Sequence, residues 1–383
     1  MKSWIEISAA ALAQNVAAIG RVAGSETQVL AVIKADGYGH GATTVAPALV
    51  RAGAHWLGAT DLAEAVDVRQ TLGSADNTRL LIMSAILPED SPGIVEHRLT
   101  PSIWTPEHIQ ALESAAAAAG TRLAIHLEIE TGMARQGAAP GSELAAALQA
   151  LAHSPHIDCE GLYTHLCESE VAHSPVTAQQ RQRFTAALDQ VLAAGISPRL
   201  VHIGNSSSVD ESSTLPFIRQ MAARIGALPM VRTGLAVYGH TLTVEGGQPH
   251  LNAQLEPALV WKAPILHLRE IVPGTTVGYG ATFTADRPMR LALLPAGYAD
   301  GFRRAGSSGV GNGWVMVAGQ RAPIVGRVSM NLTVVDVTEI PGLSIGQEAI
   351  LLGPGVTAED HARWSNTISY DILCGIRANI RLV

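Results

Sequence analysis

The sequence predicts an α/β protein in which an N-terminal (β/α)8 barrel of the TIM type precedes a β-rich C-terminal domain. Over roughly the first 240 residues, short apolar runs alternate with alanine-rich stretches about eight times, which is typical of such a barrel. From about residue 246 onward, strand-like runs separated by Gly and Pro turns replace this alternation. A doubly wound sheet is the rival fold, but no G-x-G-x-x-G motif follows a predicted strand.

The elements of the barrel are expected in a regular order, after a short strand at 4–8 and a first helix at 10–23. Pro106 suits the first position of a helix, and Gly120 and Gly195 suit helix ends. Strands are expected at 29–34, 55–59, 79–85, 99–104, 121–129, 159–166, 199–204 and 230–234. Helices are expected between most of them, at 43–54, 62–72, 106–120, 142–152 and 177–195.

The change of pattern predicts two domains, at residues 1–245 and 246–383, with GGQPHLNAQ (246–254) as the junction. The first strand, at about residues 1–10, is the part of the barrel domain that could pack with the C-terminal domain instead. Within the C-terminal domain, the only long helix is expected near the end, at 362–376.

Composition and charge exclude several classes of protein. With 383 residues, 47% of them hydrophobic, the chain has ample material for a core. The net charge of −7 argues against a nucleic-acid partner, and no run of about 18 apolar residues exists to span a membrane. Cys159, Cys167 and Cys374 are dispersed, with neither a disulfide framework nor metal-ligand spacing. A cytoplasmic enzyme without a metal site is therefore expected.

One short segment, VIKADGYGHGA at 32–42, carries the clearest chemical signal. An apolar run ends at Lys34, and a loop with three glycines, Tyr38 and His40 follows. Burial disfavours a charged lysine, and a lysine with a lowered pKa is nucleophilic and can form a Schiff base. The alternative is a lysine that only extends from a strand end into solvent.

Other polar residues follow the remaining strands, and barrel enzymes place their active sites at these strand ends. Together they suggest a site for an anionic ligand beside a reactive lysine. Taken singly, the serines could cap a helix, the histidine could be a core residue and the arginine could pair with a surface acid. The residues are Glu128, Glu130, Arg135, Tyr163, His165, Asn205, Ser206–Ser208, Arg232 and Gly234.

Nine segments in chain order resemble the motifs of the alanine racemases, enzymes of fold type III that depend on pyridoxal 5′-phosphate (PLP). The resemblance covers nearly the whole chain, and its AVIKADGYGHG and GYADG segments are highly specific. The segments are AVIKADGYGHG, TGMARQG, YTHL, HIGNSSS, VRTGLAVYG, VGYGATF, GYADGF, IVGRVSMN and TISYDIL.

The resemblance implies a role for each matching residue. Lys34 would hold PLP and act as one base, and Tyr279 would act as the second base on the opposite face. Because family members are homodimers, Tyr279 and Met330 would reach the site from the partner chain. Arg135 and Met330 would bind the substrate. The residues implied to bind the cofactor are Lys34, Tyr38, His165, Asn205, Ser206, Arg232, Gly234, Leu235 and Tyr370.

Arg232 bears on the choice of reaction, and two departures from the family pattern bear on the choice of substrate. An arginine opposite the pyridine nitrogen, here Arg232, is implied to favour racemisation, whereas fold-type III decarboxylases have an acid there. Glu128 stands where many family members have a carbamylated lysine, and it could still pair with Arg135 directly or through water. The family's usual C-M-D is here Ser329, Met330 and Asn331.

These departures leave the substrate open. We expect racemisation of L-alanine and D-alanine, with a broader or different preference, such as serine, as the alternative. A decarboxylase is a second alternative, and a protein that only carries PLP is a third. Both are disfavoured, the decarboxylase by Arg232 and Tyr279 and the carrier by the C-terminal domain.

Overall fold

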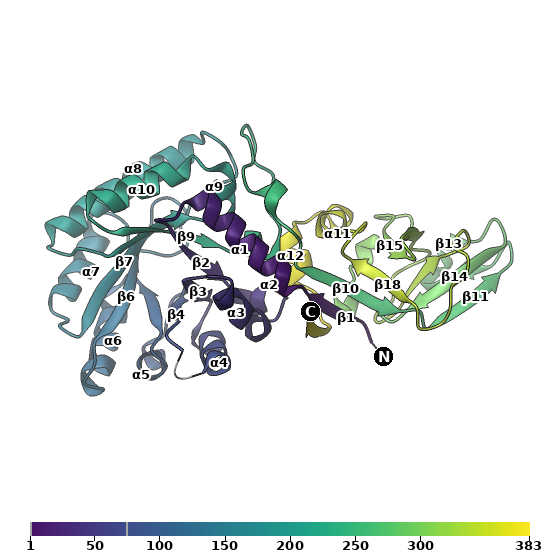
Figure 1. The fold of residues 1–383 in the computed structure, drawn as a ribbon, viewed down its shortest axis with the longest axis horizontal. Helices are drawn as coiled ribbons and strands as arrows, with labels where there is room; N and C mark the ends of the chain where they lie inside the picture. Colours follow the sequence, from purple (N-terminus) through teal and green to yellow (C-terminus); the bar gives the residue numbers. More distant parts are fainter. Residues whose placement is uncertain (1, 74–75) are drawn as a thin grey trace. The chain divides into compact units, whose positions relative to one another are not determined.

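The computed structural model describes residues 2–73 and 76–383, and the chain divides into two compact units. The barrel unit contains residues 10–37 and 45–256 (Figure 1). The C-terminal unit contains residues 257–383, the N-terminal strand up to Ala9, and the short segment 38–44. The loop after Lys34 therefore passes from the barrel unit into the C-terminal unit and back.

The barrel unit confirms the predicted fold class. Within the described residues, eight parallel strands form a closed ring in chain order, and β9 pairs back with β2. All eight lie within a few residues of the predicted positions. The strands are β2 (Gln28–Val32), β3 (Trp56–Ala59), β4 (Arg79–Ile82), β5 (Thr100–Ile103), β6 (Leu123–Glu128), β7 (Ile157–Tyr163), β8 (Leu200–Gly204) and β9 (Leu228–Thr233).

Helices follow the strands and lie on the outside of the ring (Figure 1). Two of them, α4 (Leu62–Leu72) and α7 (Ser142–Ala152), have the predicted bounds. Gly120 and Gly195 follow Ala119 and Ala194, the residues that cap the C-terminal ends of two helices, and have φ of +61° and +76°, where glycine avoids the Cβ clash of the left-handed region. The other helices are α1 (Ala9–Ala23), α3 (Ala42–Arg51), α5 (Ser91–Glu96), α6 (Pro106–Ala118), α8 (Pro175–Ala193), α9 (Ser206–Glu211) and α10 (Thr214–Arg224).

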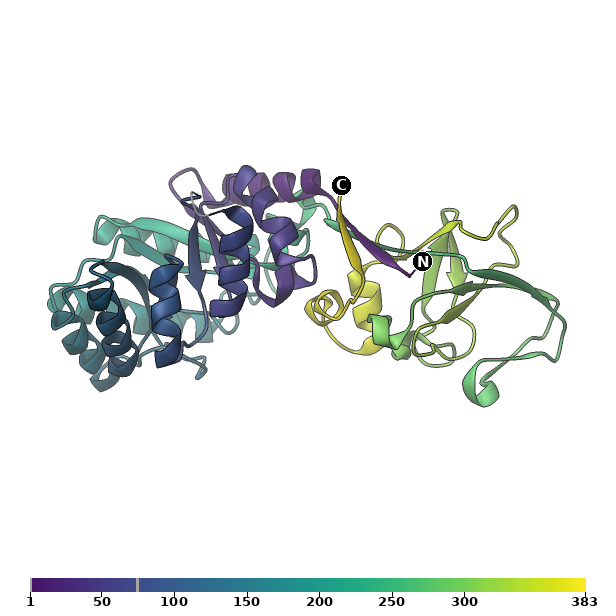
Figure 2. The ribbon, with the colours of Figure 1, turned by 90° about the horizontal axis from the view of Figure 1, so that it is seen from below.

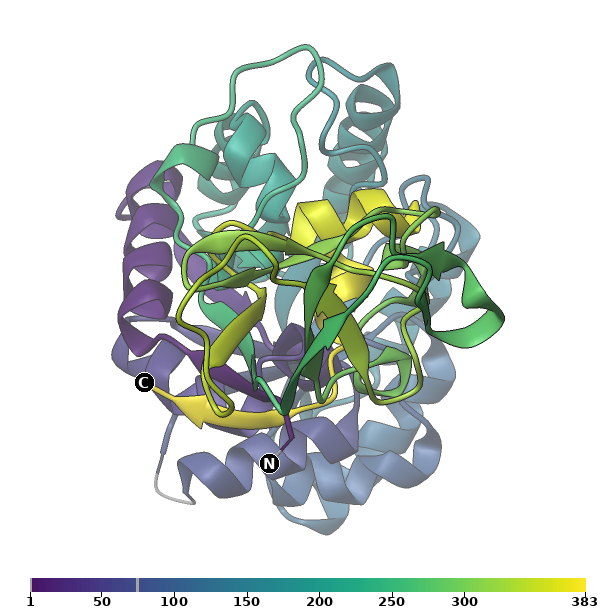
Figure 3. The same cartoon turned by 90° about the vertical axis from the view of Figure 1, so that its right-hand side faces the viewer.

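The C-terminal unit is built mainly from strands, as predicted. Its largest sheet has the order β16-β15-β18-β10-β1-β19, so the first and last strands of the chain are neighbours (Figure 2). A three-stranded sheet, β11-β14-β17, and the hairpin β12-β13 complete it (Figure 3). The strands are β1 (Trp4–Ile7), β10 (Leu259–Pro264), β11 (His267–Ile271), β12 (Thr276–Val277), β13 (Phe283–Thr284), β14 (Met289–Leu294), β15 (Trp314–Val317), β16 (Gln320–Pro323), β17 (Thr333–Asp336), β18 (Glu348–Leu352) and β19 (Asn379–Leu382).

The single helix expected at 362–376 is instead two short helices, α11 (Ala358–Ser365) and α12 (Ser369–Cys374). Asn366 ends α11 in the left-handed conformation, with φ of +50°, and its N–H bonds the carbonyls of Ala362 and Arg363. Asparagine adopts this conformation more readily than most residues, so the helix stops there although the apolar pattern continues.

The inside of the barrel contains polar side chains that are almost fully buried. His126 and Glu128 on β6, His202 on β8 and Arg232 on β9 are at most 2% exposed. Buried polar groups are costly unless they are hydrogen-bonded, so this arrangement requires a defined network. In the part of the chain that the structure describes, no helix combines the length and apolar character needed to cross a membrane.

Candidate active site

A pocket of about 190 Å³ lies at the carboxyl ends of the barrel strands, where Glu128 and Tyr163 are the last residues of β6 and β7. The structure brings six of the residues singled out from the sequence together there: Lys34, Glu128, Arg135, Tyr163, His165 and Arg232. The remaining residues that line the pocket are Thr60, Met83, Ser84 and Gln136.

Lys34 begins a tight left-handed turn, α2 (Lys34–Tyr38), and is not part of the preceding strand as the sequence suggested. Ala35, Asp36 and Tyr38 have φ of +53° to +55°. Each non-glycine residue in this region costs roughly 1–2 kcal/mol, and such strain is typical of functional loops. Glu64 on α4 anchors the turn by accepting a 2.9 Å hydrogen bond from the Asp36 N–H.

Arg232 is fixed by hydrogen bonds at both ends of its guanidinium group. Nη1 donates to the Nδ1 and the carbonyl of His202, both at 3.0 Å. Nη2 donates to the Thr164 carbonyl at 2.9 Å and to His165 Nδ1 at 3.2 Å. The guanidinium also lies 4.9 Å from the centre of the Tyr163 ring. Its Nε is buried without a hydrogen-bond partner among the described residues.

His165 is neutral and has a defined tautomer in this arrangement. Burial lowers its pKa well below the usual value, and the positive charges of Arg232, Arg135 and Lys34 lower it further. Since an arginine can only donate, His165 Nδ1 must accept from Arg232, which leaves the ring proton on Nε2.

Glu128 is held by Tyr163, which the sequence also singled out, and by Gln136, which it did not. Its Oε2 accepts a 2.6 Å hydrogen bond from the Tyr163 hydroxyl and another from Gln136 Nε2. Burial raises the pKa of Glu128, against the effect of these two hydrogen bonds and of Arg232 and Arg135. Arg135 shares the pocket with Glu128, but the carboxylate is oriented by Tyr163 and Gln136.

The residues expected to hold a phosphate lie at the ends of β8 and β9. Asn205 caps α9, accepting from the Ser208 N–H at 2.9 Å, so this residue and not a serine is the cap. The Ser206 hydroxyl accepts from the N–H groups of Gly234 and Ala236, at 3.1 and 3.2 Å. Leu235 begins the turn that follows Gly234. Backbone N–H groups and hydroxyls are thus gathered at this strand end.

The other predicted site residues belong to the C-terminal unit. The rings of Tyr38 and Tyr370 lie 5.8 Å apart in this unit, at a 47° angle. A Cβ at Gly39 would lie 2.2 Å from the Leu373 carbonyl oxygen, so the loop needs glycine there. Tyr279 and Met330 are 71% and 55% exposed. Asn331 donates to Asp300 Oδ2 at 3.2 Å.

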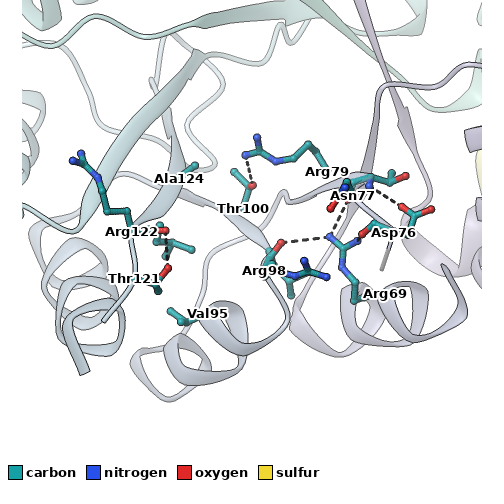
Figure 4. Close-up of a pocket in the computed structure, with 13 residues that line it drawn as sticks. Arg69, Asp76, Asn77, Arg79, Val95, Arg98, Thr100, Thr121, Arg122 and Ala124 are labelled. Carbon is teal, nitrogen blue, oxygen red and sulfur yellow. Dashed lines mark hydrogen bonds between the residues drawn. The ribbon is translucent and has the colours of Figure 1, made fainter. Parts of the chain in front are cut away.

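A second pocket, of about 300 Å³, lies at the amino ends of β4, β5 and β6 and includes four arginines (Figure 4). Two of them already have structural partners. Arg69 donates to the carbonyls of His97, Asp76, Thr78 and Arg98, and Arg79 donates to Thr100 and to Glu160. Arg69 and Arg79 therefore hold backbone and side-chain groups together at the opposite end of the strands from Lys34.

Sequence reasoning missed the polar residues within the strands, in particular His126, Glu160 and His202. His126 and His202 each lie inside an apolar run, which by itself is typical of a core residue, and Glu160 lies in a more polar stretch after Asp158. The available signal was that three successive strand candidates each contain an internal polar residue. In a closed barrel, inward-facing residues of neighbouring strands meet in layers.

Two family models together cover most of the chain: "Alanine racemase, N-terminal domain" matches residues 7–242, and "Alanine racemase, C-terminal domain" matches residues 258–383. The chain is 32% identical over 378 residues to the alanine racemase of Desulforamulus reducens, covering 98% of this chain and 97% of that one. It is similar to the solved structure of alanine racemase from Clostridium difficile 630, with a TM-score of 0.90, 28% identity, and coverage of 100% and 96%. A structure of the C. difficile enzyme in complex with cycloserine gives a TM-score of 0.86, 27% identity, and the same coverage.

Proposed function

The chain belongs to the alanine racemase family, and on that premise we propose that it interconverts L-alanine and D-alanine with PLP as cofactor. The observation that carries the proposal is the pocket in which Lys34 and Arg232 lie together. An amine at a strained strand end can hold an aldehyde cofactor covalently, and a buried guanidinium can meet its ring.

The residues of the pocket fit PLP. Arg232 Nε is a buried donor without a partner among the described residues, and the pyridine nitrogen of PLP is an acceptor. Hydroxyl and backbone N–H groups of Ser206, Gly234 and Leu235 suit a phosphate, and we propose that Asn205, Tyr38 and Tyr370 contribute to its binding. Bound there, PLP would withdraw electrons from the amino acid and make its Cα–H bond acidic.

Racemisation requires a proton to leave one face of Cα and another to arrive on the opposite face. We propose that the Lys34 amine serves one face and the phenol of Tyr279, from the partner subunit of a homodimer, serves the other. A largely exposed tyrosine is compatible with such a role across an interface. Arg135 and the Met330 N–H are proposed to bind the substrate carboxylate.

Arg232 favours racemisation over decarboxylation. A guanidinium has no acceptor for a hydrogen bond from a protonated ring nitrogen and does not readily give up a proton of its own, so the nitrogen that it faces stays an unprotonated acceptor. The network around Arg232 places neutral histidines, and no carboxylate, against its terminal nitrogens. With its ring nitrogen unprotonated, PLP would withdraw electrons less strongly. This limits side reactions that need long-lived negative charge on the cofactor.

A first prediction tests the proposed reaction in the wild-type protein. With PLP and L-alanine in D2O, we expect D-alanine that carries deuterium at Cα, without release of CO2, as judged by chiral chromatography and mass spectrometry. Release of CO2 and ethylamine would instead identify a decarboxylase, and absence of any turnover would identify a carrier. L-serine in the same assay tests the alternative substrate, and a strict preference for alanine would refute it.

A second prediction concerns Glu128. The lysine that many family members have at this position must react with CO2 before it carries a negative charge, whereas Glu128 is already a carboxyl group held by Tyr163 and Gln136. We therefore expect turnover to be the same in CO2-free buffer and in buffer with added bicarbonate. Activity that bicarbonate restores would contradict this assignment.

A further inference from the structure

A line of buried side chains connects Arg232 to Glu160, which lies on β7 and faces the opposite end of the barrel from Lys34. Arg232 Nη1 lies 3.0 Å from His202 Nδ1, and His202 Nε2 lies 2.9 Å from His126 Nδ1. His126 Nε2 lies 3.8 Å from Glu160 Oε2, an electrostatic contact beyond hydrogen-bond distance, and has no hydrogen-bond partner among the described residues. The four residues come from β9, β8, β6 and β7, and all are at most 7% exposed.

The positions of the protons follow from the chemistry of the two ends. Arg232 can only donate, so His202 Nδ1 accepts and the proton of this neutral ring is on Nε2. His202 Nε2 then donates to His126 Nδ1, which places the second ring's proton on Nε2, facing Glu160. Every donor in the line therefore points from Arg232 towards the carboxylate.

Electrostatics supports this pattern of charges. Burial lowers the pKa of His202 well below its usual value, with further lowering by His126 and Arg232, and burial also lowers the pKa of His126. Burial opposes ionisation of Glu160, but its contacts with His126 and Arg79 outweigh this effect and bring its pKa to about 2. Two neutral imidazoles thus lie between a permanent cation and a permanent anion.

The ring of His126 is held tightly in this line. A Cβ at Gly161 would lie 2.6 Å from the His126 ring, so the ring occupies space that only a glycine leaves open. The Trp56 ring packs on it with centroids 5.0 Å apart, and the guanidinium of Arg79, which donates to Glu160, lies 4.4 Å from the centre of the Trp56 ring. Gly161 therefore leaves the space that the ring occupies, and the Glu160 carboxylate lies 3.8 Å from its Nε2.

We propose that Glu160 and His126 are positioning residues for Arg232. The Glu160 carboxylate selects the Nε2–H tautomer of His126, which selects the same tautomer of His202, so that Arg232 Nη1 meets an acceptor and Nε remains available. Only the last link, from Arg232 Nε to the cofactor ring, rests on the proposed function. Without the carboxylate, His202 can turn a donor towards Arg232 and disturb the guanidinium.

The direct test reads the tautomers by 15N NMR of ring nitrogens in histidine-labelled protein without cofactor. In the wild type we expect His126 and His202 as neutral Nε2–H tautomers at pH 7. In Glu160→Gln, whose amide can accept or donate, we expect a mixture of tautomers at both rings, and Glu160→Asp should restore the wild-type state. Glu113→Gln is the matched control, since Glu113 also accepts from a histidine, His156 at 2.7 Å, outside this line.

The functional consequence is read in the protein loaded with PLP. In Glu160→Gln we expect roughly tenfold weaker PLP binding, a shifted absorption maximum of the bound cofactor, and a lower kcat with KM nearly unchanged. If Glu160 only formed an ion pair with Arg79, Glu160→Gln would have lower thermal stability but unchanged PLP binding, absorption maximum and kcat. If the wild type binds no PLP, the proposed function fails. The tautomer experiment, which uses protein without cofactor, still tests whether Glu160 and His126 position Arg232.

A second variant keeps the proposal testable if Glu160→Gln does not fold. His126→Leu removes the acceptor of His202 but leaves the carboxylate and Arg79 in place. We expect the His202 signals to change in this variant as in Glu160→Gln. Unchanged His202 signals in either variant would overturn the proposal.

Discussion

Replacing Lys34 with alanine is expected to lower racemase turnover by roughly 10³-fold or more, because the change removes both the covalent attachment of PLP and one of two bases. Lys34 is one of only three lysines in the sequence, with Lys2 and Lys262. Lys262 forms ion pairs with Glu6 and Glu348 in the C-terminal unit. Lys34 is therefore the single lysine in the barrel unit that can hold an aldehyde.

The measurement combines turnover with the site of attachment. Borohydride reduction of the wild type loaded with PLP should fix the cofactor to the peptide that contains Lys34, as identified by mass spectrometry. The Lys34→Ala variant should lose PLP on dialysis, whereas Lys2→Ala, which alters an exposed lysine, should keep both cofactor and activity. Label on the Lys262 peptide, or full activity in Lys34→Ala, would refute the assigned role.

The order of barrel elements could be predicted from the sequence because each unit is encoded locally. Period-two and period-3.6 patterns mark strand and helix, and Gly and Pro mark their ends, so α4 and α7 have the predicted bounds. The predicted strand at 29–34 was too long because the apolar run continues to Ile33, whereas the chain turns into the left-handed region after it. That turn depends on Glu64, which is distant in the sequence.

The candidate site could be predicted only in part, for a related reason. Polar residues at strand ends, such as Lys34, His165 and Arg232, stand out against the apolar run that precedes them. His126 and His202 lie inside apolar runs, and their 2.9 Å contact depends on how β6 and β8 are placed across the barrel. Spacing along one strand contains no information about that placement, so the line from Arg232 to Glu160 required coordinates.

Arg232 and Tyr279, the proposed second base, also differ in how their side chains are held in place. Arg232 is held by backbone acceptors on β8 and directly after β7, so its orientation is a property of the barrel unit alone. Tyr279 is exposed and lies in a short turn between β12 and β13, so the role that we propose for it requires an interface to orient its ring. A test of Tyr279 as the second base is therefore also a test of whether two chains assemble into a dimer.

Replacing Tyr279 with phenylalanine is expected to lower racemisation by about 10²- to 10⁴-fold while PLP still binds. In the proposed mechanism the phenol serves only one face of Cα, so Lys34 should continue to exchange the Cα proton of one enantiomer with solvent. In D2O, we expect deuterium in one enantiomer of recovered alanine and almost none in the other, as measured by chiral chromatography with mass spectrometry. Exchange in both enantiomers, or in neither, would contradict a second base at this position.

Mixing of two inactive variants then shows which chain supplies the phenol. If Lys34→Ala and Tyr279→Phe homodimers exchange subunits at random, half of the dimers are mixed and each has one complete site of two, which should restore about one quarter of wild-type activity. The matched control is an equal mixture of the wild type and the double variant that carries both Lys34→Ala and Tyr279→Phe. It should retain about one quarter of the activity of undiluted wild type if the phenol crosses the interface, and about one half if each chain uses its own. Failure of the first mixture to regain activity, together with one half in the control, would place Tyr279 in the same chain as Lys34.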